Sequence, residues 1–208
     1  MPQLDSASLG AVAGPLQAWI LPALLGLGLA SATGLRTFLP LLMLAVATRF
    51  DLFGLRLNDQ MAWLVSTPAI AALGVAAAAE FLGDKVPAVD HGLNLLGYVT
   101  RPVAGAVAAG SVFWALDPTT AAIAGVIVGA PAALAFNAAQ SGVRIGSTAT
   151  TGGLGNPVVS LVEDALSVVT VILAFLAPIV VPVLLVLLMI VVFRLGRRLR
   201  DHRWARTA

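Results

Sequence analysis

The sequence predicts an all-α, polytopic transmembrane helix bundle of about six spans. Hydrophobic residues make up 59% of the 208-residue chain and charged residues only 11%, against about 25% charged residues in an average soluble domain. The apolar residues gather in separate stretches that are long enough, as helices, to cross the roughly 30 Å hydrocarbon core of a bilayer. Alternation of apolar and polar residues with a period of two is absent, which argues against an outer-membrane barrel. We therefore expect a single integral membrane domain over residues 1–208.

The first apolar segment, from about Pro15 to Thr48, is too long for one straight span. Its middle holds a polar, glycine-containing stretch from Ser31 to Thr37, and Pro40 follows shortly after. A discontinuous helix or a tight hairpin fits these residues better than a regular helix, and we expect a broken first helix. Residues 49–60 mix charged and apolar side chains, which is typical of a connection at the membrane interface.

Three further spans are expected at Met61 to Leu82, Gly92 to Leu116 and Thr119 to Ala139. In the last of these, Gly125, Gly129 and Ala133 recur every four residues, and Asn137 follows on the same helical face. Small residues at this spacing let helix backbones approach closely. The pattern therefore predicts a helix-packing stripe.

Residues 140–156 are rich in glycine, serine and threonine and include Arg144. This composition fits a flexible loop and a re-entrant membrane segment equally well, and the sequence leaves both open. Pro157 then opens an apolar run that continues to Phe193, at a helix position where proline is tolerated. Pro178 and Pro182 are expected to divide this run into two spans.

The distribution of basic residues predicts the orientation. Six arginines crowd the end of the chain: Arg194, Arg197, Arg198, Arg200, Arg203 and Arg206. By the positive-inside rule, the basic tail over residues 195–208 is expected to be cytoplasmic, in a multi-pass protein of the bacterial inner (plasma) membrane. Counting back through six crossings puts Lys85 and Arg144 inside and Asp117 outside. Arginines that adjoin a membrane span are a poor indication of nucleic-acid binding, and the main partner is the lipid bilayer.

Several kinds of site are excluded by residue type. The chain has no cysteine, so disulfides, iron–sulfur clusters and thiolate zinc sites are ruled out. It also lacks the Gly-x-Ser-x-Gly, His-Glu-x-x-His and P-loop motifs of common hydrolytic sites. No cofactor is expected, although Glu80, Asp84, Glu163 and Asp164 would suit Mg²⁺ or Ca²⁺ if a metal binds.

Adjacent carboxylates within the apolar run, Glu163 and Asp164, indicate where function resides. A charged carboxylate in the bilayer core costs about 2.5 kcal/mol or more unless partners or water reach it, so such a residue usually faces the protein interior or a pathway. On a helix that starts near Pro157, successive members of a polar set are three or four residues apart: Asn156, Ser160, Glu163, Asp164 and Ser167, the two acids being adjacent. Together they predict one polar stripe.

A second acidic group lies where the segment from Met61 to Leu82 ends. It comprises Glu80, Asp84 and Asp90. Buried carboxylates without a counter-charge would protonate, so arginines within apolar segments are the expected partners. The candidate substrate- or ion-binding residues are therefore Arg36, Glu80, Asp84, Asp90, Arg101, Arg144, Asn156, Ser160, Glu163 and Asp164.

A short pattern occurs twice in the chain. Thr33-Gly34-Leu35-Arg36 is echoed by Ser141-Gly142-Val143-Arg144, each after an apolar helix rich in small residues. With six crossings, the echo predicts a 3+3 inverted repeat with halves over residues 16–116 and 119–194, as in many secondary transporters.

Several motifs together resemble a known family. They are Gly34-Leu-Arg36, Glu80-x-x-x-Asp84-Lys85-x-Pro87-x-x-Asp90, Arg101-Pro102-x-x-Gly105 and Asn156-Pro157-x-x-Ser160-x-x-Glu163-Asp164. In these motifs the chain resembles domain of unknown function 4126, a family of uncharacterised bacterial integral membrane proteins. The resemblance covers most of the chain after residue 25. It implies a membrane location and marks these residues, but it implies no reaction.

The function predicted from these residues is that of a small transporter or channel-like permease with a buried carboxylate/arginine site, coupled to protons or cations. Two alternatives stay open. One is a membrane-embedded enzyme that acts on a phospholipid or polyprenyl phosphate with Mg²⁺, and the other is a non-catalytic membrane assembly subunit. A homodimer is plausible, because a bundle of this size can barely enclose a pathway alone.

Overall fold

The computed structural model describes residues 14 and 16–180, together with residues 183–184, 186–187 and 190. Its elements in chain order are η1 (Leu16–Ile20), α2 (Leu21–Leu35), α3 (Leu39–Arg49), η2 (Leu52–Gly54), η3 (Asp59–Val65), α4 (Thr67–Gly83), α5 (Pro87–Ser111), α6 (Pro118–Thr151) and α7 (Asn156–Leu176). The described part of the chain contains no β-strand. The predicted all-α fold is confirmed.

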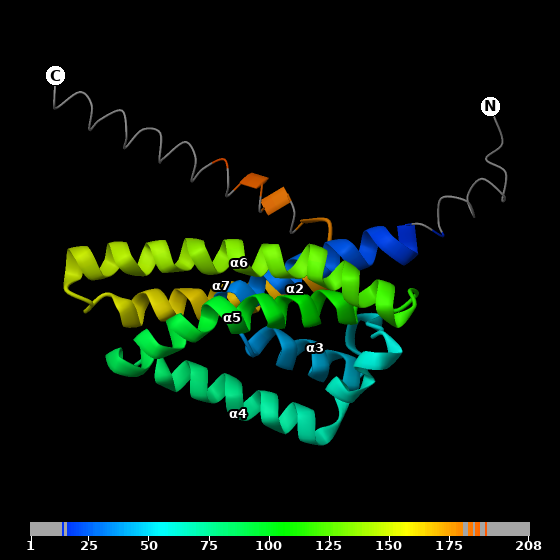
Figure 1. Cartoon of the computed structure of the whole chain (residues 1–208), viewed down its shortest axis with the longest axis horizontal. Coiled ribbons are helices and arrows are strands. Elements are labelled where there is room, and N and C mark those ends of the chain that lie inside the picture. The colour runs from blue at the N-terminus through cyan, green and yellow to red at the C-terminus, as the bar shows by residue number, and fades with distance from the viewer. Residues whose placement is uncertain (1–13, 15, 181–182, 185, 188–189, 191–208) are drawn as a thin grey trace.

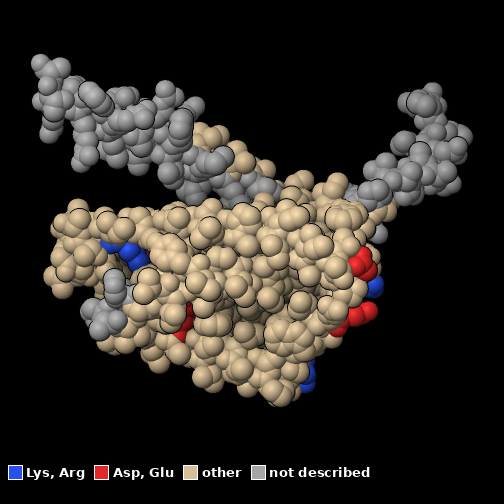
Figure 2. Space-filling model, viewed as in Figure 1, with Lys and Arg blue, Asp and Glu red and all other residues tan. Residues whose placement is uncertain are grey.

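The helices form an elongated bundle (Figure 1). Helix α2 packs against α5, α6 and α7, while α4 lies at the outer side of the bundle, next to α3 and α5. The buried apolar core is drawn from α2, α3, α5 and α7, with Leu29, Leu44, Val112 and Val171 at its centre. Over much of the face in Figure 2 the surface is uncharged, which suits contact with acyl chains.

The first helix is broken, as predicted. Helix α2 ends at Leu35, Arg36 adopts an extended conformation with φ −136° and ψ 119°, and α3 begins at Leu39. Pro40 lies in the first turn of α3, where its missing N–H leaves no intrahelical hydrogen bond unmade. The break leaves a polar turn with free backbone N–H groups inside the protein, and these need acceptors from elsewhere in the chain.

The predicted span from Met61 to Leu82 is instead a bent pair. The 3₁₀ helix η3 and α4 meet at an angle of 65°. Ser66 lies between them in an extended conformation, and its side chain accepts a hydrogen bond from Ala69 N at 3.3 Å. The serine cap, followed by Pro68 in the first turn, starts a new helix rather than continuing the old one.

Glycines hold α5 and α6 in close contact. A Cβ at Gly105 would lie 2.6 Å from the Cβ of Ala133 and 2.8 Å from the carbonyl oxygen of Gly129. The buried residues of α6 are Ala121, Gly125, Gly129, Ala133, Asn137, Gln140 and Arg144. The predicted packing stripe is therefore confirmed, and the structure extends it by two more positions toward the C-terminal end.

Both interpretations of residues 140–156, as a loop or as a re-entrant segment, were wrong for most of this region. Helix α6 continues without interruption to Thr151 and ends at Gly152, whose φ of 64° is left-handed. Hydroxyl groups in the last turns bond back to helix carbonyls, as Thr151 Oγ1 does to Ser147 O at 2.7 Å. Contacts of Gln140 and Arg144 with other helices, described below, hold this end of α6 in place.

By length and composition, the described part of the chain has three helices that could cross a membrane, or up to four if the bent pair of η3 and α4 is one span. The three are Ala18–Leu35, Pro118–Thr151 and Asn156–Leu176. These apolar helices are consistent with a membrane-embedded protein. Six spans and an inverted repeat are not confirmed. The predicted last span, after Pro178, and the basic tail over residues 195–208 lie largely or wholly outside the described residues.

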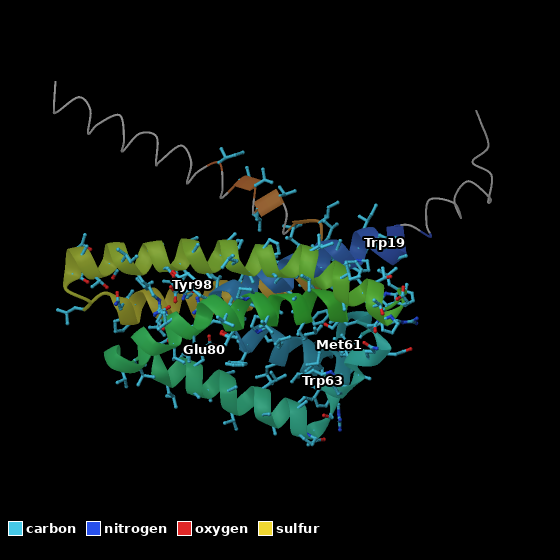
Figure 3. The ribbon with its side chains drawn as sticks, viewed as in Figure 1. Trp19, Met61, Trp63, Glu80 and Tyr98 are labelled. Atoms are coloured by element: carbon cyan, nitrogen blue, oxygen red, sulfur yellow. The ribbon has the colours of Figure 1, made fainter. Side chains whose placement is uncertain are left out.

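Aromatic side chains mark one end of the bundle. Trp19 and Trp63 are about half exposed, and both lie toward the end of the bundle opposite to Glu80 and Tyr98 (Figure 3). Exposed tryptophans are enriched at the headgroup level of membranes. This end is therefore suited to one membrane interface.

Asp117 caps the start of α6 and gives a test of pH dependence. Hydrogen bonding by Thr120, with a further backbone N–H from Thr119, holds the pKa of Asp117 below its usual value. A lowered pKa in the folded state means that the stabilisation is complete above the unfolded value of about 4 and disappears as the pH falls through the folded value. We expect the wild type to exceed Asp117→Asn in melting temperature at pH 6, and this difference to vanish at low pH. A difference that is the same at both pH values would contradict this account.

Candidate functional site

Seven ionisable side chains from five parts of the chain converge in the half of the bundle where α6 turns into α7. We call them the ion cluster: Arg36, Glu80, Asp84, Arg101, Arg144, Glu163 and Asp164. Six of the seven are buried, and Asp164 is partly buried. All seven are among the candidate residues predicted from the sequence.

Arg36, at the break between α2 and α3, is the most deeply buried of the seven, with a relative exposure of 2%. Its Nη1 forms an ion pair with Asp84 Oδ2, at the end of α4. Its Nη2 donates to the backbone oxygen of Ser160 at 3.0 Å and to Ser160 Oγ at 2.7 Å. Its Nε lies 2.6 Å from Asp164 Oδ1. One guanidinium therefore joins α2, α4 and α7, which the planar fork of arginine donors makes geometrically feasible.

Arg144 joins α6 to the same acids. Its Nη2 lies 2.5 Å from Glu163 Oε2 and its Nε 3.2 Å from Glu163 Oε1, an arrangement in which two nitrogens face two oxygens. The same Nη2 is 3.3 Å from Asp84 Oδ2. Asp84 thus accepts from both Arg36 and Arg144. Such charge-assisted, two-point contacts are stronger and more specific in geometry than neutral hydrogen bonds.

Arg101, on α5, donates to neutral oxygens rather than to a carboxylate. Its Nη1 bonds to Gln140 Oε1, to Asn137 Oδ1 at 2.5 Å and to Gly34 O at 3.2 Å. Gln140 links Arg101 to Glu163, because its Nε2 donates to Glu163 Oε2 at 2.7 Å. Gln140 was not among the site residues predicted from the sequence. If the helix is continued past residue 139, Gln140 falls on the same face as Ala133, Asn137 and Arg144, and this spacing could have identified it.

Glu80 has a different role in the cluster. Its Oε1 accepts from Thr37 N at 2.9 Å and its Oε2 from Phe38 N at 3.3 Å. These are the free N–H groups at the break in the first helix, so Glu80 places a carboxylate at the start of α3. Negative charge is favoured at a helix N-terminus, where the helix dipole is positive.

Asp164 is the acid of the cluster that is least satisfied. Its Oδ2 is buried and has no hydrogen-bond partner, and the Nε of Arg36, although close to Oδ1, is not aimed at it as a hydrogen bond. Its neighbour Glu163, by contrast, is bonded at both oxygens by Arg144. Two adjacent carboxylates therefore differ sharply in how firmly the protein holds them.

Asp164 also borders a cavity of about 400 Å³ between α3, α4 and α7. Arg36, Glu80 and Asp164 line its polar end, and most of the remaining lining is apolar. The cavity is partly open to the surroundings. It brings part of the ion cluster within reach of a molecule from outside the bundle.

One of the predicted site residues does not join the ion cluster. Asn156 lies at the start of α7 and exchanges hydrogen bonds with the hydroxyl of Thr148, on the outer part of the α6–α7 turn. The predicted polar stripe therefore reaches the cluster only from Ser160 onward. The side chain of Asp90 lies outside the described residues. Lys85, which was not among the predicted residues, donates to Ser160 Oγ at 3.3 Å.

Among the described residues, no group of three or more histidine, cysteine, aspartate or glutamate side chains is arranged to hold a metal ion. The acids named above as metal candidates face arginines or backbone N–H groups instead. The site is therefore built to pair charges.

Comparison with known proteins places the chain in a family. The family model described as a domain of unknown function (DUF4126) matches residues 23–198. The chain belongs to the DUF4126 family. The matched region includes the whole ion cluster and all the helices that line the cavity. No match was found among curated proteins or among solved structures. Because the DUF4126 description names no activity, function has to be argued from the geometry of the site.

Proposed function

We propose that this DUF4126 protein is a small, proton-coupled permease of the bacterial inner membrane, with its basic tail in the cytoplasm. The observation that carries the proposal is Asp164: a carboxylate with an unpartnered oxygen, at the edge of a cavity, next to an arginine that it shares with Asp84. Ionisable residues at membrane depth that face a cavity are typical of proton and ion pathways.

In this mechanism Asp164 alternates between two states. When it is ionised, it attracts Arg36, and its carboxylate at the edge of the cavity can also attract a positively charged group. When it takes up a proton, its attraction for Arg36 disappears, while Arg36 keeps its contacts with Asp84 and Ser160. A proton and a cation thus compete for one carboxylate, which is the requirement for exchange of one against the other.

The other acids of the cluster already have hydrogen-bond donors. Glu163 is held by Arg144 and Gln140, and Glu80 by two backbone N–H groups. Their oxygens are also already in use, which gives the Mg²⁺-dependent enzyme less support than the permease.

The test is proton movement in proteoliposomes. A pH-sensitive dye inside the vesicles reports whether an imposed pH gradient collapses when a panel of inorganic cations and amines is added outside. We expect the wild type to respond to at least one member of the panel and Asp164→Asn to give no response. The variant should stay folded and monodisperse, because Asp164 Oδ2 has no hydrogen-bond partner and Arg36 keeps its contacts with Asp84 and Ser160 when the ion pair with Asp164 is lost.

Asp59→Asn is the matched control, since Asp59 is exposed at the start of η3, and it should respond as the wild type does. If Asp164→Asn retained the wild-type response, the proposal would be wrong. If Asp164→Asn failed to fold and no panel member moved protons with the wild type, the assembly-subunit alternative would be favoured instead.

A further inference from the structure

The cavity between α3, α4 and α7 has the size of a small-molecule site. Its volume of about 400 Å³ lies within the range of roughly 300–1,000 Å³ that is common for such sites. It is bounded by three helices that come from different parts of the chain, so its shape is set by the tertiary fold and not by one loop.

The walls of the cavity are apolar. Leu39 and Leu42 from α3, Ala78 and Phe81 from α4 and Val168 from α7 line it. Three of the residues that line the cavity are charged: Arg36, Glu80 and Asp164. An occupant that matches this lining has a sizeable apolar body and one polar group.

One carboxylate at the polar end of the cavity is not fully hydrogen-bonded. Glu80 already accepts from two backbone N–H groups, and the two terminal nitrogens of Arg36 are engaged by Asp84 and Ser160, while its Nε lies 2.6 Å from Asp164 Oδ1 without forming a hydrogen bond. The oxygen left over is Asp164 Oδ2, which is buried and has no hydrogen-bond partner. A buried acceptor without a donor is costly, so a ligand that donates a hydrogen bond relieves that cost.

Charge favours the same kind of ligand. Of the three ionisable residues that line the cavity, two are acids and one is a base. An anionic group beside Asp164 would meet a carboxylate, whereas a protonated amine would form a charge-assisted hydrogen bond. The net negative charge of the lining residues therefore favours a cationic ligand.

We propose that the ligand of this cavity, and the substrate of the permease, is an amphiphilic organic cation: a protonated amine on an apolar body, whose N–H donates to the carboxylate of Asp164. The inference rests on the proposed function, because cavity and carboxylate are shared. The substrate enters through the open side of the cavity from the bilayer. The proton that Asp164 carries leaves for the aqueous phase as the ammonium group takes its place, so charge is exchanged one for one.

A matched series of three probes tests this: decylammonium, decanol and decanoate, which share one chain and differ in charge. Binding to the full-length protein in nanodiscs of zwitterionic lipid is compared with partition into empty nanodiscs. We expect decylammonium to bind more tightly than decanol by roughly tenfold or more, as a charge-assisted hydrogen bond implies, and decanoate to show no saturable binding. Asp164→Asn should abolish the preference for decylammonium over decanol.

A second variant tests the location of the ligand. A Cβ at Gly74, on the α4 wall, would meet nothing within 4 Å, so Gly74→Leu fills the cavity without disturbing the backbone. It should weaken decylammonium and decanol alike. Gly142→Leu is the control, because Gly142 is also a helical glycine with open space at its Cβ but lies outside the cavity lining.

Equal binding of all three probes would show that the cavity binds acyl chains without distinguishing the charge of the ligand, and would overturn the inference. So would decylammonium binding that Gly74→Leu leaves unchanged. If decylammonium does not bind but inorganic cations still move protons in an Asp164-dependent way, the substrate class is wrong and the permease stands. If decylammonium binds at Asp164 and moves no protons, the permease fails and the binding site remains.

Discussion

Replacing Arg36 with alanine is expected to leave little folded, monodisperse protein. The change removes the ion-pair partner of Asp164 and leaves Asp84 with Arg144, 3.3 Å away, as its counter-charge, and it removes two hydrogen bonds to Ser160. Breaking a buried ion pair by removing one partner costs about 3–5 kcal/mol, while the whole stability of a typical domain is only about 5–15 kcal/mol. Size-exclusion chromatography and thermal unfolding of the purified protein measure the loss.

Arg49→Ala provides the comparison. Arg49 is exposed, and its side chain donates to Val65 O at 2.8 Å, so its replacement should change the free energy of unfolding by only about 0.5 kcal/mol. An Arg36→Ala protein that is as stable as Arg49→Ala would show that the buried pairs contribute no net stability. Partial recovery on also replacing Asp84 with asparagine would instead locate the damage in the uncompensated negative charge.

Of all replacements of a glycine by alanine in the bundle, Gly129→Ala is expected to lower the stability of the protein most. An added Cβ would overlap the carbonyl group of Gly105 and come within 2.9 Å of Ala106 N, and these are backbone atoms that cannot rotate away. The two helices must separate, at a typical cost of about 1–3 kcal/mol for forcing extra volume into a packed interface. Because Gln140 and Arg144 lie on the same face of α6 as Gly129, the shift should also disturb the ion cluster.

Gly142→Ala, on the same helix, is the control that distinguishes the effect of helix packing on stability from the effect of helix propensity. A Cβ at Gly142 meets nothing within 4 Å, and alanine favours a helix over glycine by about 1 kcal/mol. This variant should therefore be as stable as the wild type or more so. If the melting temperatures of the two variants moved together, close packing of α5 and α6 through glycine would not be what holds them.

Features of the fold that depend on residues close together in the sequence could be predicted from local patterns. The polar stretch around Gly34 and the following Pro40 predicted the break between α2 and α3. The four-residue spacing of Gly125, Gly129 and Ala133 predicted the buried face of α6. The cost of charge in an apolar run also identified the acids and arginines that meet in the ion cluster, since such groups need partners inside the protein.

Prediction from the sequence failed where distant contacts override composition. The glycine, serine and threonine content of residues 140–156 predicted a loop or a re-entrant segment, yet α6 continues to Thr151. The bonds of Gln140 and Arg144 to Glu163 hold this part of the helix. The partners of Glu80 are backbone N–H groups more than 40 residues earlier in the chain. The cavity likewise depends on where α3 lies after the break, which no periodicity in its sequence specifies.

The bond between Glu80 and the break in the first helix has a mechanical consequence. Helix α3 supplies one wall of the cavity through Leu39 and Leu42, and the start of that helix is fastened to α4 by the two oxygens of a single carboxylate. The distance between these two walls of the cavity therefore depends in part on the two hydrogen bonds of Glu80. Loss of these bonds is expected to let the start of α3 move away from α4 and change the width of the cavity, without any change in the packing of α5 and α6.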